Sequence, residues 1–350
     1  MGIYLNPENI DFRKSLNSEI YIDKTELIAY TNKKLNTEQG YICVSRPRRF
    51  GKSMAANMLT AYYSRGCDSR KLFQGLKIAM HSDFEKHLNQ YNVIHLNMRD
   101  YLTESENIKQ LIQFVEDDLL DELQQEFSDL RMPRRKTLVK VLEQAFAQYK
   151  IPFVFIIDEW DCIFRVHKSD AASQKEYLDF LRNLLKDKSY IALAYMTGIL
   201  PIKKYGEHSA INVFYEYSMT DASPIEEFTG FTEQEVQQLC EQYNMPFSET
   251  KKWYDGYCVD GVSIYNPKSV VEAMLRGKFS NYWTQTETYE ALKIYIQSNE
   301  FGVQDVILKL LAGFSDGISL PGRILLSWFH RWQGGRRGEV RCPYNIDKEL

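Results

Sequence analysis

Clustered cysteines and long apolar runs are missing from this chain of 350 residues, and each absence excludes a class of protein. The six cysteines are scattered without a Cys-x-x-Cys pair and the six histidines are dispersed, so neither a disulfide framework nor a zinc site is indicated. No run approaches the roughly 18 apolar residues of a membrane-spanning helix, and the first residues lack a signal-peptide pattern. We therefore expect a cytoplasmic protein without a membrane partner.

A strong charge of either sign is missing as well. The formal net charge of −4 gives no overall attraction to nucleic acid or to an anionic membrane. The densest basic cluster is the stretch 131–136, for which two interpretations stay open: a solvated linker or a nucleic-acid contact. The length leaves room for about two domains with an ample core.

The stretch 41–53 follows a strand–loop–helix pattern. Tyr41–Ser45 is short, apolar and β-branched, which predicts a buried strand. A turn through Pro47 and Gly51 comes next, and good helix formers run from Ser53 to Tyr63. Backbone N–H groups of such a loop and the N-terminus of such a helix can face an anion together. Gly-Lys-Ser in this context therefore predicts a phosphate-binding loop.

The loop departs from the full pattern G-x-x-x-x-G-K-[ST], because Arg46 stands where the first glycine belongs. We expect Lys52 to reach the β- and γ-phosphates of a nucleotide, and the Ser53 hydroxyl to bind Mg²⁺. The residues that we expect to line the nucleotide are Arg46, Pro47, Arg48, Arg49, Phe50, Gly51, Lys52 and Ser53.

A second apolar segment, about a hundred residues later, ends in two carboxylates. Phe153–Ile157 predicts a strand buried on both faces, and Asp158 and Glu159 follow it directly. In an open α/β sheet, ligands bind outside the carboxyl ends of the strands. Asp158 would then hold the Mg²⁺ water shell, and Glu159 would polarise the attacking water. The alternative is a core strand that ends in a solvated acidic turn.

Several ordered phrases carry a resemblance to a known family. Arg-Pro-Arg-Arg-Phe-Gly-Lys-Ser (46–53), Ile-Ile-Asp-Glu-Trp-Asp (156–161) and Trp-Tyr-Asp-Gly-Tyr (253–257) are among them. Over residues 1 to about 312, the chain resembles the AAA-ATPase-like family of bacterial P-loop NTPases, whose loops also lack the first glycine. The resemblance implies ATP and Mg²⁺ as ligands and ATP hydrolysis as the activity.

The resemblance also assigns a role to a later strand. Tyr190–Met196 predicts a strand that ends at Thr197 and Gly198. In one branch of P-loop ATPases, such a strand lies between the phosphate-loop strand and the carboxylate strand, and a polar residue at its end senses the γ-phosphate. Thr197 is our candidate for that residue. The alternative is a threonine that merely ends a strand.

The expected fold is α/β: a P-loop NTPase with a mainly parallel sheet flanked by helices, followed by a small helical lid-like domain. We place the ATPase domain at 1–225 and the lid-like domain at 226–312, where Thr232 and Glu235 form a capping box. Residues 313–350 match nothing in the family, whose members often continue into a nuclease-like domain with a PD-(D/E)XK core. We expect this tail to be foreign, from a frameshift or truncation, and poorly ordered.

Three functions remain open on the sequence alone. The leading one is Mg²⁺-dependent ATP hydrolysis that drives a conformational change, with Glu159, Lys52 and Thr197 as catalytic residues and Ser53 and Asp158 at the metal. The sequence defines no arginine finger: Arg48 and Arg49 in the loop are candidates, and a neighbouring subunit in a homo-oligomer or another protein partner is the alternative source. The alternatives are an ATP-binding switch or scaffold with little turnover and the ATPase remnant of a DNA-processing nuclease.

Overall fold

A computed structural model describes residues 2–202, 211–219, 221–259 and 261–282 of the chain. The tail at 313–350, and the part of the predicted lid-like domain beyond residue 282, lie outside the described residues. None of the helices within the described ranges combines the length and the apolar character that crossing a membrane requires.

The centre of the molecule is a five-stranded sheet in which every pairing is parallel. Its order is β2-β3-β4-β1-β5, so β4 lies between the strand of the phosphate loop and the carboxylate strand, as predicted. The predicted strands at 41–45, 153–157 and 190–196 are confirmed. The strands of this sheet are β1 (Tyr41–Ser45), β2 (Asn92–Asn97), β3 (Phe153–Asp158), β4 (Ile191–Gly198) and β5 (Tyr215–Tyr217).

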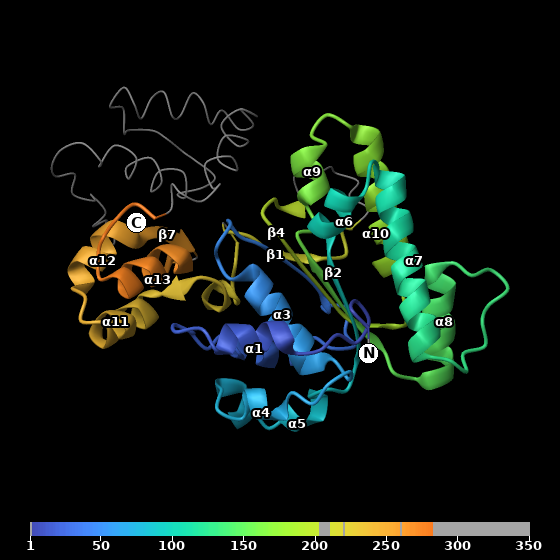
Figure 1. The fold of residues 1–350 in the computed structure, drawn as a ribbon, viewed down its shortest axis with the longest axis horizontal. Helices are drawn as coiled ribbons and strands as arrows, with labels where there is room; N and C mark the ends of the chain where they lie inside the picture. Colours follow the sequence, from blue (N-terminus) through green and yellow to red (C-terminus); the bar gives the residue numbers. More distant parts are fainter. Residues whose placement is uncertain (1, 203–210, 220, 260, 283–350) are drawn as a thin grey trace, which may run out of the picture.

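Helices cover both faces of this sheet, because alternate residues of its strands point to opposite sides. Phe155 and Ile157 of β3 join one apolar core with α7, α8 and α10, whereas Val154 and Ile156 join a second core with α1, α2 and α3 (Figure 1). The helices, with one 3₁₀ helix (η1), are α1 (Ile10–Leu16), α2 (Glu26–Asn32), α3 (Lys52–Tyr63), α4 (Arg70–Phe73), η1 (Lys77–Met80), α5 (Phe84–His87), α6 (Met98–Glu104), α7 (Ile108–Glu126), α8 (Leu138–Tyr149), α9 (Cys162–Val166) and α10 (Ala171–Leu185). The predicted α/β class is confirmed.

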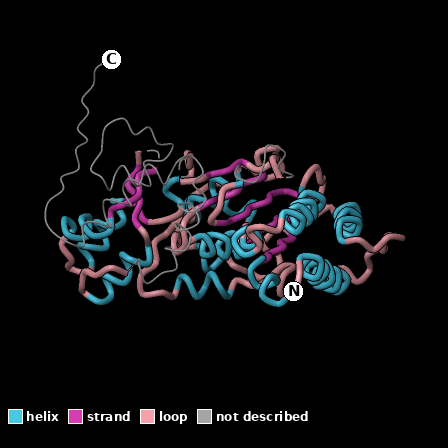
Figure 2. Tube along the Cα trace, turned by 90° about the horizontal axis from the view of Figure 1, so that it is seen from above, coloured by secondary structure: helices cyan, strands magenta, loops and turns pink. Residues whose placement is uncertain are grey.

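A smaller module follows the sheet, beyond the 3₁₀ helix η3 (Glu226–Phe228). Three antiparallel strands in the order β6-β8-β7 accompany three helices, and Figure 2 shows this second sheet apart from the central one. The predicted capping box of Thr232 and Glu235 is present at the start of α11. The strands and helices are β6 (Phe231–Thr232), α11 (Glu233–Gln242), α12 (Phe247–Tyr254), β7 (Asp255–Val259), β8 (Val262–Tyr265) and α13 (Pro267–Arg276).

The module lies at one end of the molecule, and α7 and α8 lie at the other (Figure 1). The basic stretch 131–136 connects α7 to α8, and its Arg134, Arg135 and Lys136 are exposed. Its interpretation as a nucleic-acid contact stays a prediction, as does the division of the chain into domains at residue 226.

Candidate active site

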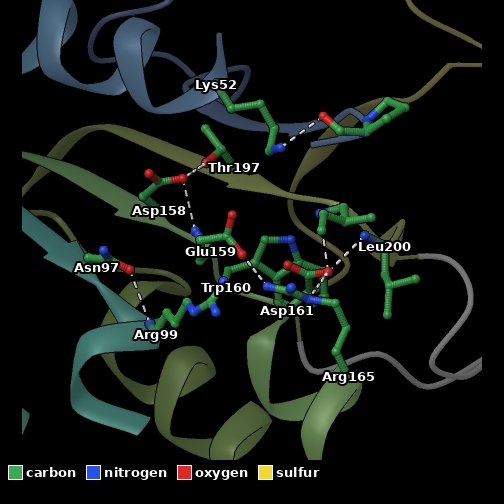
Figure 3. Close-up of polar contacts among 12 residues, drawn as sticks. Lys52, Asn97, Arg99, Asp158, Glu159, Trp160, Asp161, Arg165, Thr197 and Leu200 are labelled. Carbon is green, nitrogen blue, oxygen red and sulfur yellow. Dashed lines mark hydrogen bonds and ion pairs between the residues drawn. The ribbon is translucent and has the colours of Figure 1, made fainter. Parts of the chain in front are cut away.

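The predicted site residues gather at the carboxyl ends of β1, β3 and β4. Parallel pairing sets Ser45 of β1 beside Gly198 of β4, and Ile157 of β3 beside Met196. The residues that follow these strand ends are therefore brought to one edge of the sheet. Figure 3 shows Lys52, Asp158, Glu159 and Thr197 together at this edge.

The predicted phosphate loop, residues 46–51, is tied to its surroundings by Arg46. This side chain is 1% exposed, and its guanidinium donates to the carbonyl of Tyr217 on β5 (2.8 Å) and to the hydroxyl of Thr229 (3.0 Å). Its backbone N–H donates to the carbonyl of Gly198 (3.1 Å). Arg46, which stands where the usual glycine would be, thus connects β1 to β5, to β4 and to the start of the small module. Its assignment as a nucleotide ligand stays a prediction.

The other loop residues differ in exposure. Pro47 and Arg48 are half-buried and Arg49 is exposed. Phe50 is fully buried, with its ring 4.9 Å from that of Tyr257 on β7. Gly51 has a φ of +84°, a conformation that side chains of L-residues resist, so glycine is required here by the turn into α3.

Lys52 is buried in the first turn of α3. Its ammonium donates to the carbonyl of Pro47 (3.1 Å), which uses one of its three N–H donors. Burial lowers the pKa of Lys52, and the nearby Glu159 and Asp158 carboxylates oppose that shift. The other two donors have no partner among the described residues, so the site presents a partly desolvated cation.

Asp158 and Thr197 are joined by a hydrogen bond from the Thr197 hydroxyl to Oδ1 of Asp158. The same oxygen accepts from the backbone N–H of Glu159 (2.9 Å), whereas Oδ2 accepts nothing from the described part of the chain. Ser53 is exposed in the first turn of α3. The described ranges contain no cluster of three or more His, Cys, Asp or Glu side chains suited to a metal ion.

Glu159 belongs to a buried ionic network that the sequence analysis missed. Its carboxylate pairs with Arg165 of α9, and Arg165 also contacts Oδ2 of Asp161 (3.2 Å). Asp161, which has no exposed surface, accepts the backbone N–H groups of Ile199 (3.1 Å) and Leu200 (2.8 Å). The available signal was the four-residue spacing from Asp161 to Arg165, which places both on one helical face.

Three comparisons with known proteins each found a similar protein or family. An "Uncharacterized protein in vnfD 5'region" from Azotobacter chroococcum mcd 1 is 26% identical over 280 residues, which are 77% of this chain and 51% of the relative. The chain therefore spans about half the length of that relative. The "Structure of the Aeropyrum Pernix ORC2 protein (ADPNP-ADP complexes)" has 10% identity and a TM-score of 0.34, covering 64% of this chain and 54% of that one.

A family model described as "Predicted AAA-ATPase" matches residues 11–206. This span contains the phosphate loop, the carboxylate strand and Thr197, that is, each residue that we predicted to be catalytic or to bind metal. The chain belongs to the AAA-ATPase-like family.

Proposed function

We propose that this protein binds ATP with Mg²⁺ at the carboxyl edge of its sheet and hydrolyses it. The observation that carries the proposal is the convergence of Lys52, Asp158, Glu159 and Thr197 at the carboxyl ends of three neighbouring parallel strands. Catalysis of phosphoryl transfer is mostly positioning and charge stabilisation, which these groups can supply. Membership of the family supports nucleotide binding in general.

The phosphates would lie over the loop and the N-terminus of α3. Lys52 supports this assignment because two of its N–H donors have no partner in the described residues, although its ammonium is buried. A triphosphate supplies the negative charge that such a cation lacks, and the positive end of the helix dipole acts in the same direction. Binding would thus offset part of the desolvation cost of the buried Lys52 ammonium.

The donor set at the edge fits magnesium. Mg²⁺ usually keeps several waters and takes one or two protein oxygens plus phosphate oxygens, so a three-carboxylate cage is not required. Oδ2 of Asp158 and the exposed Ser53 hydroxyl are oxygen donors of that kind. A bound Mg²⁺ would neutralise charge that develops on the phosphates. Thr197 would keep Asp158 in place for this task through its hydrogen bond.

Glu159 is the proposed base. One of its oxygens, Oε2, is held by Arg165, whereas Oε1 has no partner among the described side chains and backbone groups. Oε1 could accept a proton from water while the water oxygen attacks the γ-phosphorus. Thr197 borders the same edge, which supports its proposed role as a sensor of the γ-phosphate.

Phosphate release from the purified protein with Mg-ATP tests this proposal, alongside Lys52→Ala and Glu159→Gln. We expect both variants to lose turnover by about 100-fold or more, and only the glutamine variant to keep ATP binding. Arg182→Met, an exposed change on α10, is the control and should keep the parental rate. ATP binding without turnover in the parent would contradict hydrolysis and favour the nucleotide-dependent switch.

A further inference from the structure

The side chain of Arg165 occupies an unusual position for an arginine. It is 9% exposed, and it lies between the carboxylates of Glu159, which is 16% exposed, and Asp161, which is fully buried. Figure 3 shows Arg165 reaching both carboxylates from α9, on the side of the site opposite Lys52. A desolvated ion pair is weak evidence for a stabilising role, because the loss of hydration offsets much of the attraction. A role in holding a functional group explains this arrangement better.

Asp161 links Arg165 to the backbone that follows β4. Its Oδ2 accepts two backbone N–H groups, from Ile199 and Leu200, directly after the end of β4. The carboxylate that contacts Arg165 is therefore anchored to the backbone of the strand that carries Thr197. Arg165 cannot shift without losing its ion pair with this anchored carboxylate.

Glu159 contacts Arg165 with one of its two carboxylate oxygens. Its backbone has a φ of +55°, in the left-handed region, at the turn that leaves β3. Its side chain starts from this turn and contacts Arg165 through Oε2, whereas Oε1 has no partner in the part of the chain that the structure describes (Figure 3). A single well-directed contact of this kind selects one rotamer without consuming the second oxygen.

We propose that Arg165, anchored by Asp161, is the positioning residue that directs Oε1 of Glu159 toward the attacking water; this rests on the proposed hydrolysis of ATP. The water proton passes to Oε1, the water oxygen bonds to the γ-phosphorus, and the bond from that phosphorus to the bridging oxygen of ADP breaks. Arg165 takes no proton and touches no reacting atom. Its effect on the rate passes entirely through Glu159.

The test compares Arg165→Met, Arg165→Lys, Glu159→Gln and the double variant Arg165→Met/Glu159→Gln in the full chain. We expect Arg165→Met to lower kcat by about 10- to 100-fold, which is the usual cost of misplacing a catalytic group. The Kd for Mg-ATP should change by less than about threefold, because Arg165 is proposed to act through Glu159 and not on the nucleotide. Arg165→Lys, which restores the cation but only one contact, should recover part of the rate.

The double variant separates positioning from general damage. Because Arg165 acts through Glu159, adding Arg165→Met to Glu159→Gln should lower kcat no further. Independent, multiplied losses would overturn the proposal, and so would an unchanged kcat in Arg165→Met. A fall in Mg-ATP affinity equal to the fall in rate would also overturn it. A parent that binds Mg-ATP without hydrolysing it would refute the proposed function itself, and the role of Arg165 with it.

Discussion

At the scale of single residues, one tight packing constraint at the site is the absence of a side chain at position 198. A Cβ there would lie 2.6 Å from Nε1 of Trp160 and 2.8 Å from Oδ1 of Asp161. Both of those atoms are buried and neither has a hydrogen-bond partner in the described residues. The β4 backbone therefore packs directly against the segment that carries the network of Arg165.

Replacement of Gly198 by alanine should consequently destabilise the protein. Overpacking of a rigid interior costs about 1–3 kcal/mol, and the displaced groups, Trp160 and Asp161, adjoin Glu159, so turnover should fall as well. Denaturant unfolding and phosphate release measure the two effects. Gly75→Ala is the matched control, because a Cβ at that position meets nothing within 4 Å. Equal stability of the two variants would contradict this packing argument.

At the scale of elements, the small module contains a fully formed cap at the start of α11. The Thr232 side chain accepts the backbone N–H of Glu235 (3.3 Å), and the Glu235 carboxylate accepts that of Thr232 (2.8 Å). The same carboxylate pairs with Lys24 (2.6 Å), which also donates to the carbonyl of Glu227 (2.7 Å). The cap thus also joins the N-terminal segment to the module.

Thr232→Ala should lower the free energy of unfolding by about 1 kcal/mol, the usual cost of losing an N-cap. Thr137→Ala is a matched control, because Thr137 occupies the N-cap position of α8 without a side-chain capping bond. Denaturant titrations of both variants measure the difference. If the Thr137 variant lost as much stability as the Thr232 variant, the capping bonds would not be the cause.

Elements with strong local signals were predictable from the sequence. The strand of Tyr41–Ser45, the helix after Lys52 and the capping box of α11 each carry a pattern that local chemistry fixes. The three residues of β5 were missed because so short an edge strand has no periodicity to detect. Strands β7 and β8 were missed because their pairing depends on contacts between segments and not on local propensity.

Some features of the candidate site were likewise predictable from the sequence, and others were not. The phosphate-loop motif and the strand followed by Asp158 and Glu159 were predictable, because each motif is contiguous in the sequence. The Arg46 bridge to Thr229 and the pairing of Thr197 with Asp158 join residues far apart in the chain, so only the folded structure reveals them. Exposure also varies within a contiguous phrase: in 253–257, Trp253 is 41% exposed, whereas its neighbour Tyr254 is buried.

At the scale of the whole molecule, the predicted phosphate loop connects the sheet to the small module. Phe50 inserts its ring into a cluster formed with Tyr257 and Ile264, and its carbonyl accepts the N–H of Gly230 (3.0 Å). Arg46 holds Thr229 nearby. A nucleotide that shifts the loop would therefore act directly on the module.

Phe50→Ala should weaken the contact between the loop and the small module. Removing a buried phenylalanine side chain costs about 3–5 kcal/mol, and the loosened loop should bind Mg-ATP less tightly. Calorimetric unfolding and nucleotide titration measure the two losses. Tyr215→Ala, an aromatic residue that is 47% exposed on β5, should cost less than about 0.5 kcal/mol as the control. Unchanged stability in the Phe50 variant would show that the packing of Phe50 against the module does not stabilise the protein.

We propose above all that the edge formed by β1, β3 and β4 binds Mg-ATP. An equilibrium titration of the purified protein with Mg-ATP tests this binding most directly. We expect saturable binding that weakens when Mg²⁺ is chelated. Lys52→Ala should weaken it by about 100-fold, the loss of a buried charged contact, and Lys33→Ala, an exposed change at the end of α2, should leave it unchanged. Equal affinity in the Lys52 variant and the parent, or no binding at all, would contradict the account.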